Sequence, residues 1–539
     1  MPADQHSYVG RDSQLRNGYP NELTDGGAGE FRSILFPETD ESAFQPVPSE
    51  PGFFHDLNLD QAVASITAAW REYDLTPFFW QPLQRVDTIV YRQEIMRDLE
   101  SSTVAQAISA FSRDMRQMRK TLPQAEKYYF AYERERQFLS AVQVYLRAVT
   151  TLARDLAEIE LCSNGMRSFA DYLSTYVASS QFMTLASHAE VIDSALCSIR
   201  YYLYIHGSSV TVRLYEDDRD YSEAVETTFQ KFRQGVVKDY YVKDREMTGM
   251  NHVQEQILVR LACYFPEPFE ALVSFANQNT DFLDQKTSRF DREIQFYIAY
   301  LAHIRKLQDV GLPFCYPRFD DVSKETEASN AFDLALAEKL LANNTSLVLN
   351  DFSLKGAERI IVISGPNHGG KTTYARMIGQ IHYLGALGCP VPGTRARLFL
   401  FDRLFTHFER QERIETLRGK LQDDLVRVHT ILEQATPRSL VIMNEIFSST
   451  MLQDAVFLGR EVITRLSALD LLCVCVTFLD ELSVLNEKTV SMVATVDPDN
   501  HAVRTYRLER KPADGLAYAL AIAEKHHVTY QWLTRRISS

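Results

Sequence analysis

The sequence has no long apolar run, no CxxC pair and no excess of positive charge, and each absence narrows the possible functions. The longest apolar run, Leu471 to Leu479, is far too short to span a bilayer and is typical of a buried strand. Seven scattered cysteines indicate reduced thiols and no zinc site, in a cytoplasmic protein that we expect to carry no signal peptide. The net charge of −14 predicts that any nucleic-acid contact is a local basic patch.

The organisation of the 539 residues follows from changes in periodicity. Residues 1–50 are rich in Gly, Pro and acidic residues and are expected to form a disordered tail. Residues 51–330 carry mostly helical spacing in long segments, with one alternating stretch, Arg200 to Glu216, that predicts a β-hairpin. In residues 331–539, short apolar strands alternate with helices, which predicts an α/β domain.

A phosphate-binding loop is the strongest motif in the chain. Residues 365–372, GPNHGGKT, fit G-x-x-x-x-G-K-[ST] between a predicted strand and a predicted helix. Backbone N–H groups and the helix N-terminus would cradle phosphates, Lys371 would reach the β- and γ-phosphates, and Thr372 would offer its hydroxyl to Mg²⁺. The alternative is a coincidental glycine-rich turn.

A second motif, SLVIMNEIFSST, follows about 70 residues later. A buried strand that ends in two polar residues is the usual place for a Mg²⁺ ligand and a water-activating carboxylate. Glu445 is therefore the candidate catalytic base, and Asn444 stands where an Asp ligand is expected. The alternative for Glu445 is a helix-capping or surface carboxylate.

These motifs resemble the MutS family of DNA mismatch-repair ATPases. GPNHGGKTT is similar to the family's GPNMGGKST, and NEIFSSTMLQDA is similar to its DEIGRGTSTYDG. Weaker similarities cover Leu347 to Asp351, Leu400 to Phe408, Val476 to Leu482 and Tyr518 to Ile537, and, more faintly, Pro82 to Met96. The similarity is strong over about 200 C-terminal residues and thinner over the helical half.

The resemblance implies an α plus α/β fold, in which a long helical core and lever domain with a small hairpin precedes an ABC-type P-loop ATPase domain. C-terminal helix–turn–helix elements from about residue 515 would carry dimer contacts. ATP and Mg²⁺ are the implied cofactors, with Glu445 and Lys371 as catalytic residues and Thr372 and Asn444 at the metal. The implied nucleotide contacts are Gly365, Pro366, Asn367, His368, Gly369, Gly370, Lys371, Thr372 and Thr373. A partner subunit would add a signature loop corresponding to Arg418 to Asp424.

Several positions depart from the family pattern. Asn444 replaces an aspartate, Phe478 replaces the histidine of THY, and Gly419-Lys420 stand where the signature has Ser-Thr. These changes predict intact nucleotide binding with slow hydrolysis. The mismatch-recognition domain has no counterpart, and we interpret Phe36-Pro-Glu38, which matches the Phe-x-Glu wedge as a string, as coincidence.

Two basic stretches could contact DNA. The first places Arg113, Arg116, Arg119 and Lys120 along one predicted helix. The second follows the predicted hairpin and interleaves cations with aromatic residues; its basic members are Lys231, Arg233, Lys238, Lys243 and Arg245. Such stretches suit backbone or shape recognition without sequence readout. The alternative for each is a solvated helix face.

We therefore predict a MutS-like slow ATPase of the DNA damage sensor type. It would be a homodimer in a bacterial cytosol or at the nucleoid, and its ATP state would gate a clamp on mismatched, damaged or branched DNA. Two other interpretations remain open. One is a protein-interaction scaffold in which nucleotide is a structural ligand with negligible turnover. The other is a DNA enzyme with a hidden nuclease site, although no metal-ligand cluster is apparent in the sequence.

Overall fold

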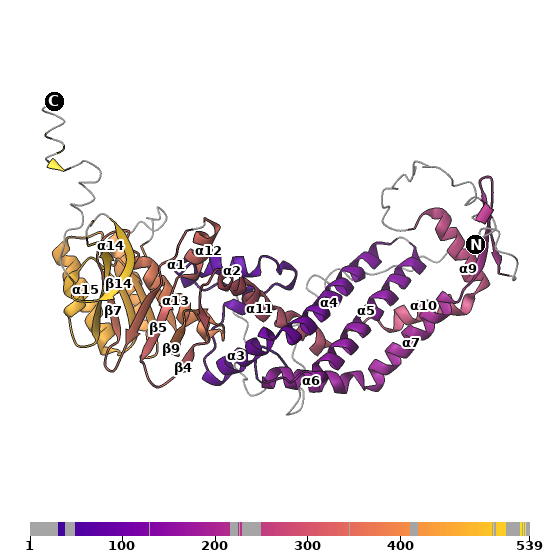
Figure 1. The fold of residues 1–539 in the computed structure, drawn as a ribbon, viewed down its shortest axis with the longest axis horizontal. Helices are drawn as coiled ribbons and strands as arrows, with labels where there is room; N and C mark the ends of the chain where they lie inside the picture. The colour runs from indigo at the N-terminus through magenta and orange to yellow at the C-terminus, as the bar shows by residue number, and fades with distance from the viewer. Residues whose placement is uncertain are drawn as a thin grey trace. The chain divides into compact units, whose positions relative to one another are not determined.

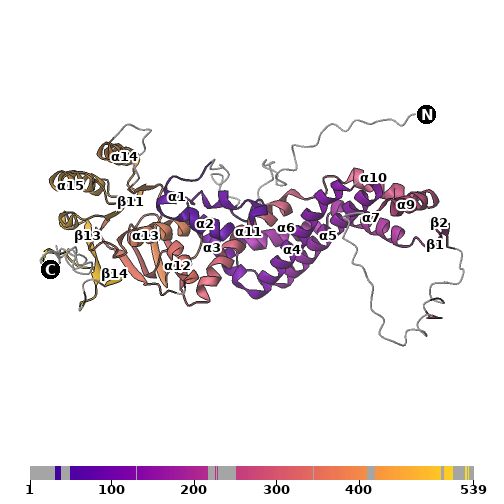
Figure 2. The same ribbon diagram turned by 90° about the horizontal axis from the view of Figure 1, so that it is seen from above.

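The computed structural model divides the chain into two compact units, which are described separately (Figures 1 and 2). Among the residues that the structure describes, those within 101–161 and 167–291 form the helical unit, and those within 31–100, 162–166 and 292–534 form the sheet unit. No helix among the described residues is long and apolar enough to cross a membrane. The structure describes residues 31–37, 49–128, 130–215, 250–343, 345–409, 419–498, 500 and 503–513, with isolated positions at 225, 227, 228, 529, 530, 532 and 534.

The helical unit is built around two long helices, α4 (Ser102–Lys127) and α5 (Ala131–Glu158). On α5, residues spaced by three or four positions are buried, as expected for an amphipathic helix, whereas charged residues lie between them. At the start of α11 (Gln285–Gln308), Phe290 stacks on Phe169 with ring centroids 3.5 Å apart. The remaining helices of the unit are α6 (Asn164–Val177), α7 (Ser180–Cys197), α9 (His252–Tyr264) and α10 (Pro266–Gln278).

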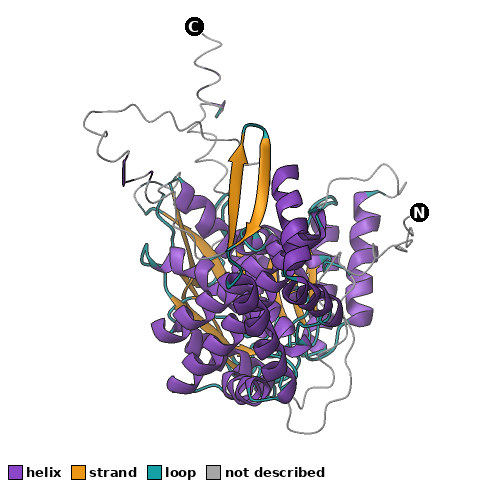
Figure 3. Ribbon diagram, turned by 90° about the vertical axis from the view of Figure 1, so that its right-hand side faces the viewer, coloured by secondary structure: helices purple, strands orange, loops and turns teal. Residues whose placement is uncertain are grey.

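The predicted β-hairpin is present in the helical unit (Figure 3). Strand β1 (Tyr201–His206) pairs antiparallel with β2 (Ser209–Leu214), and Gly207 takes the left-handed φ of +58° that the tight turn requires. Val212 is buried, whereas the side chains of most other hairpin residues are exposed. The alternating pattern therefore located the element correctly.

The main sheet of the sheet unit has the strand order β10-β11-β12-β7-β13-β14. The first five strands run parallel, and β14 is antiparallel to β13. All residues of the three central apolar strands β11, β12 and β7 are buried, as expected for a parallel sheet covered on both faces. The bounds are β10 (Leu404–His407), β11 (Leu440–Asn444), β12 (Leu472–Val476), β7 (Ile360–Ser364), β13 (Thr489–Val496) and β14 (Arg504–Arg510).

Helices pack on the main sheet, and α13 (Lys371–Ala386) is the most enclosed of those described there. It contacts β11 and β12, and thirteen of its sixteen residues are buried. An apolar cluster joins the sheet to α14 (Lys420–Gln434), α15 (Leu452–Ala468) and the short helix η5 (Asp480–Val484). The α/β domain predicted from alternating strands and helices is therefore present.

The N-terminal part of the sheet unit packs against α13. Arg376 Nε donates to Asp56 O at 2.9 Å, Gln380 Nε2 to Leu57 O at 2.8 Å, and the Tyr383 hydroxyl to Phe79 O at 2.8 Å. These partners lie in or directly after short helices, so this chain segment satisfies the buried polar groups of α13. The elements are α1 (Phe53–Asp56), α2 (Leu59–Thr67), η2 (Arg71–Tyr73), η3 (Thr76–Phe79) and α3 (Val86–Glu100).

The expectation of a disordered tail over residues 1–50 is wrong for residues 31–37, which are part of the core. Ile34 and Leu35 are fully buried, the Tyr297 hydroxyl donates to Ile34 O at 2.7 Å, and Arg92 Nε donates to Leu35 O at 2.8 Å. Phe36 lies under the Arg92 guanidinium, 4.8 Å from it, which gives its side chain a structural role. Residues 1–30 and 38–48 lie outside the described residues.

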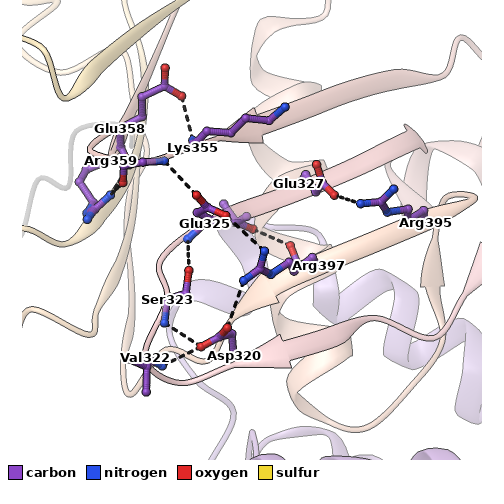
Figure 4. Close-up of polar contacts among 12 residues, drawn as sticks. Asp320, Val322, Ser323, Glu325, Glu327, Lys355, Glu358, Arg359, Arg395 and Arg397 are labelled. Carbon is purple, nitrogen blue, oxygen red and sulfur yellow. Dashed lines mark hydrogen bonds and ion pairs between the residues drawn. The ribbon is translucent and has the colours of Figure 1, made fainter.

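A second, four-stranded sheet shows that strands begin before the expected boundary at residue 331 (Figure 4). Its order is β4-β9-β5-β6, and Arg397 bridges Asp320 and Glu325 at 3.2 Å each. Because β4 and β5 pair with β9, the segment from β4 to residue 331 belongs to the sheet unit and not to the helical unit. The bounds are β4 (Arg318–Asp320), β9 (Arg395–Phe399), β5 (Thr326–Ala331) and β6 (Asn350–Leu354); β3 (Phe314–Cys315) pairs with β8 (Val391–Pro392), and α12 (Leu334–Ala342) follows β5.

An ion-pair cluster around Asp470 ties together the strand starts of the sheet unit. Its carboxylate contacts Lys488 at 2.8 Å, Lys324 at 3.0 Å and Arg359 at 3.1 Å. Partial burial alone would raise the pKa of Asp470, but hydrogen bonds from Lys488 and Lys324 hold that pKa well below its usual value. One carboxylate therefore neutralises cations from three separate chain segments.

Asp470→Asn should lower the melting temperature of the sheet unit by roughly 2–4 °C, as expected for a loss of about 1 kcal/mol. Asparagine tolerates the φ of +57° but leaves three cations without a counter-charge. Calorimetry is the measurement, with Glu461→Gln, from the exposed pair with Arg465, as the control that should not change.

The difference between wild type and Asp470→Asn should also depend on pH. It should be complete above the unfolded aspartate pKa of about 3.9 and shrink as pH falls toward the lowered folded value. An equal difference at all pH values would assign the effect to lost packing instead of to charge.

Candidate nucleotide-binding site

The loop between β7 and α13 has an unusual backbone. Gly365, His368 and Gly370 have φ values of +113°, +60° and +90°. A Cβ atom at Gly365 would lie 2.9 Å from Ala494 O, a backbone atom of the neighbouring strand β13. The loop thus curls tightly at the N-terminus of α13, a geometry in which backbone N–H groups can bind an anion.

Lys371 is the first residue of α13, and its ammonium group folds over the loop. Its Nζ atom donates to Gly365 O at 2.8 Å and to Pro366 O at 3.1 Å. It also lies 4.9 Å from the centroid of the Phe478 ring, which is a cation–π contact. Burial lowers the pKa of Lys371, and the nearby Glu445 carboxylate opposes that shift. The Phe478 ring therefore contacts the loop lysine directly.

Thr372 and Asn444 are brought together as the metal assignment requires. The Thr372 hydroxyl donates to Asn444 Oδ1 at 2.9 Å, and the two residues come from the start of α13 and the end of β11. Both side chains present oxygen atoms, the ligand type that Mg²⁺ prefers. The pair is neutral, however, because Asn444 brings no charge.

Glu445 directly follows β11 and has a left-handed backbone with a φ of +56°. Its N–H donates to Val476 O at 2.9 Å, which fixes the peptide at the end of β12. Burial raises the pKa of Glu445, the Lys371 ammonium lowers it, and the Glu409 carboxylate raises it further. Glu445 thus has a strained backbone and a half-buried carboxylate close to the loop lysine, which is the environment expected of a general base.

The start of α14 is the segment that the resemblance assigned to the signature loop. Lys420 forms an ion pair with Glu409, and both groups act on the pKa of Glu445. The buried His407 ring lies 3.3 Å from Asp424 and holds this end of α14 to β10. Residues 410–418 lie outside the described residues.

Arg504 is a site residue that sequence reasoning missed. It begins β14, and its Nε atom donates to Asn367 O in the loop at 3.1 Å. Its positive charge also lowers the pKa of Lys371, after the larger effect of burial. Nothing in the local sequence signals this contact, because it depends on how β14 pairs with β13.

The predicted DNA contacts have two different outcomes. The basic stretch after the hairpin lies outside the described residues; its members are Lys231, Arg233, Lys238, Lys243 and Arg245. Most of the segment Tyr518 to Ile537, which is predicted to carry dimer contacts, also lies outside them. The other basic stretch lies on α4. There Arg119 is paired with the fully buried Asp291, and Arg113 lies 3.6 Å from Asp114. These two arginines serve ion pairs within the helical unit.

Comparison with known proteins matches residues 361–535 to the family model for MutS domain V. These matches support a MutS-family protein. It is 27% identical over 255 residues to the DNA mismatch repair protein MutS of Thermosipho melanesiensis, a match that covers 44% of this chain and 31% of that protein. It is 33% identical over 190 residues to Endonuclease MutS2 of Gemmatimonas aurantiaca, which covers 34% of this chain and 23% of that protein. The matches thus span less than a third of these curated relatives.

The MutS domain V match includes the loop, Asn444, Glu445 and Phe478, so the site lies inside the family's ATPase domain. Within the part of the chain that the structure describes, no group of three or more His, Cys, Asp or Glu side chains could hold a metal ion. The Thr372–Asn444 pair instead offers two neutral oxygen atoms.

Gly365→Ala should weaken nucleotide binding by at least about tenfold, because the added Cβ would collide with Ala494 O and force the loop open. Titration with a fluorescent ATP analogue is the measurement. Gly356→Ala is the matched control, since Gly356 also has a positive φ but open space around it. If both variants bind equally well, the close contact at Gly365 does not shape the site.

Proposed function

We propose that this MutS-family protein is a slow ATPase acting in DNA repair or recombination. The observation that carries the proposal is the meeting of Lys371, the Thr372–Asn444 pair and Glu445 at the carboxyl ends of adjacent parallel strands. Ligands of open α/β sheets bind at such strand ends. The membership of the MutS family supports ATP as the nucleotide.

Each part of the proposed nucleotide contact follows from the chemistry of its residue. The loop N–H groups and the N-terminus of α13 would hold the phosphates, and Lys371 would exchange its loop carbonyl partners for phosphate oxygens. Thr372 and Asn444 would hold Mg²⁺, which when bound supplies charge neutralisation to the phosphates. The further proposed loop contacts are Pro366, Asn367, His368, Gly369 and Thr373.

Slow turnover is proposed from two neighbouring side chains. Asn444 is neutral and holds a metal-bound water less firmly than an aspartate would. Phe478 presents a half-exposed ring toward Lys371 and has no hydrogen-bonding group for the γ-phosphate. Glu445 then remains the group that orients and deprotonates the attacking water.

DNA is the proposed partner, bound by a homodimer whose nucleotide state gates a clamp. Support comes from the names of the relatives, a DNA mismatch repair protein and an endonuclease, and from the basic residues that follow the hairpin. A second candidate function is a protein-interaction scaffold with structural nucleotide. The cation–π contact between Lys371 and Phe478 favours it, because that contact adds to the loop carbonyls with which a phosphate must compete.

Glu445→Gln should reduce single-turnover ATP hydrolysis by at least about 100-fold while leaving nucleotide affinity nearly unchanged, since the amide is isosteric but not basic. In the wild type, the rate should fall as pH is lowered through the raised pKa of Glu445, at a higher pH than for an ordinary glutamate. Rapid-quench measurements across pH would give both results.

Two further variants separate binding from chemistry. Lys371→Ala should abolish tight ATP binding, whereas Asn444→Asp should raise Mg²⁺ affinity because it adds a charge at the metal position. Brisk hydrolysis that survives Glu445→Gln would place the base elsewhere. A strict monomer in saturating ATP, measured by light scattering, would contradict the proposed dimer.

Charge reversal at Lys238 and Lys243 should weaken DNA binding across all sequences and reduce the salt slope by about 1 per lost phosphate contact. Binding to branched and duplex DNA is measured at several salt concentrations, with reversal of the exposed Arg305 and Lys306 as the matched control. Wild-type affinity of the double variant at every salt concentration would remove this stretch from the proposed interface and favour the scaffold function.

A further inference from the structure

The phosphate-binding loop rests against β13 and β14. A Cβ atom at Gly369 would lie 3.0 Å from Ala494 Cβ, so the loop and β13 are in close contact. Near the middle of the loop, Arg504 of β14 donates from Nε to Asn367 O at 3.1 Å. These two strands therefore form one wall of the loop, and the Arg504 side chain joins that wall to the loop backbone.

The carbonyl groups of the loop find their donors in two ways. Gly365 O and Pro366 O accept from Lys371 Nζ. Pro366 O also accepts from Gly369 N at 3.2 Å. Those donors belong to the loop itself or to the first turn of α13. The donor to Asn367 O, in contrast, comes from a residue 137 positions later in the chain. The orientation of this peptide group thus depends on a strand that the loop motif does not contain.

The orientation matters because the two polar groups of a trans peptide point in opposite directions. The peptide between Asn367 and His368 is trans. With its carbonyl held by β14, its N–H group faces away from β14. His368 has a left-handed φ of +60°, and Gly370 follows with +90°. N–H groups around residues in such conformations line the concave face of an anion-binding nest. The bond from Arg504 therefore favours a loop conformation in which the His368 N–H can reach an anion.

Arg504 can fix the loop only if its own backbone is fixed, and the start of β14 meets this condition. The Thr505 hydroxyl donates to Thr495 O at 2.9 Å and lies 2.6 Å from the Thr495 hydroxyl. Asp497 N donates to Val503 O at 3.0 Å, which joins the chain after β13 to the residue before β14. The Arg504 side chain thus starts from a backbone that is tied to β13 directly beside the loop.

Arg504 also brings a positive charge, which is a second way to favour phosphate. That charge lowers the pKa of Lys371, although burial lowers it more. Arg504 is partly exposed, however, and solvent and salt screen a charge in such a position. A hydrogen bond to a single carbonyl is directional and is lost when its donor atom moves by about 1 Å. We therefore expect the position of the donor atom to matter more than the charge.

We propose that Arg504 is a positioning residue for nucleotide binding, which holds the Asn367–His368 peptide so that its N–H group meets a phosphate oxygen. The inference rests on the proposed function of the loop and adds to it a residue outside the motif. Arg504 acts through the peptide and needs no contact with the nucleotide. Because the loop is held in its binding form beforehand, little free energy is lost to reorganisation when the phosphates bind.

The test separates the donor atom of Arg504 from its charge. In Arg504→Gln the amide Nε2 takes the place of Arg504 Nε, because both nitrogens are bonded to Cδ, so the donor is kept and the charge is lost. In Arg504→Lys the charge is kept, but Nζ lies one bond farther along the side chain. Arg504→Met keeps a stem of similar length and loses both donor and charge. Arg507→Met is the matched control, since Arg507 is exposed on the same strand.

Binding of ATP and of inorganic tripolyphosphate to the full chain is measured by calorimetry. Arg504→Met should weaken both ligands by at least about tenfold, because the peptide loses its partner and its N–H group turns away from the phosphates. Arg504→Gln should stay within about threefold of wild type for both ligands, since only a screened charge is lost. Arg504→Lys should resemble Arg504→Met, and Arg507→Met should bind both ligands as wild type does.

Three results would overturn this inference alone. If Arg504→Lys binds like wild type and Arg504→Gln binds like Arg504→Met, the charge and not the position of the donor is what acts. Wild-type affinity of Arg504→Met for both ligands would remove any role in binding. A loss for ATP without a loss for tripolyphosphate would assign Arg504 to the nucleoside instead of to the loop. A wild-type protein that binds neither ligand would overturn the proposed function of the loop and this inference with it.

Discussion

The burial of α13 is the constraint on which the rest of the sheet unit depends. A helix that is enclosed on nearly all sides can keep polar residues only if each finds a partner. Gln380 donates to Leu57 O and to Asp333, and accepts from Leu334 N, so one side chain joins the segment before α2 to the start of α12. Segments that precede α13 in the sequence therefore hold the helix in place, and the loop at its N-terminus takes its position from the helix.

A fixed helix makes the unusual backbone of the site possible. Gly365, His368, Glu445 and Tyr506 all have left-handed φ values and lie in the loop after β7, directly after β11 or in β14. Such conformations cost free energy and persist where hydrogen bonds and close packing leave no alternative. Their concentration at one edge of the sheet agrees with a ligand site there, and it gives each functional side chain a single direction.

The sequence pattern located secondary structure well where contiguous motif residues stand beside a strong strand pattern, as at the start of α13 around Lys371 and at the end of β11 around Asn444-Glu445. The sequence did not predict features that depend on contacts between residues far apart in the chain. The core position of residues 31–37 depends on Arg92 and on Tyr297, more than 260 residues away from Ile34, and β5 lacks the apolar alternation that identifies a strand. The contact of Arg504 with the loop could not be predicted either, because it depends on how β14 pairs with β13 and has no local signature.

Two of the departures from the family pattern, Phe478 and Asn444, lie close to Lys371. Phe478 contacts the Lys371 ammonium through the ring face, whereas Asn444 leaves the adjacent metal position neutral. Asn444 interacts with a metal ion less strongly than the expected aspartate would, and Phe478 interacts with a phosphate less strongly than the expected histidine would. The glycine-rich loop and Glu445, in contrast, match the family pattern. Under the proposed function, nucleotide binding would depend mainly on the loop, and the rate of hydrolysis would depend on the replaced groups together with Glu445. The proposed combination of nucleotide binding with slow turnover therefore follows from one sheet edge that keeps its loop and its carboxylate but lacks two of the groups expected around them.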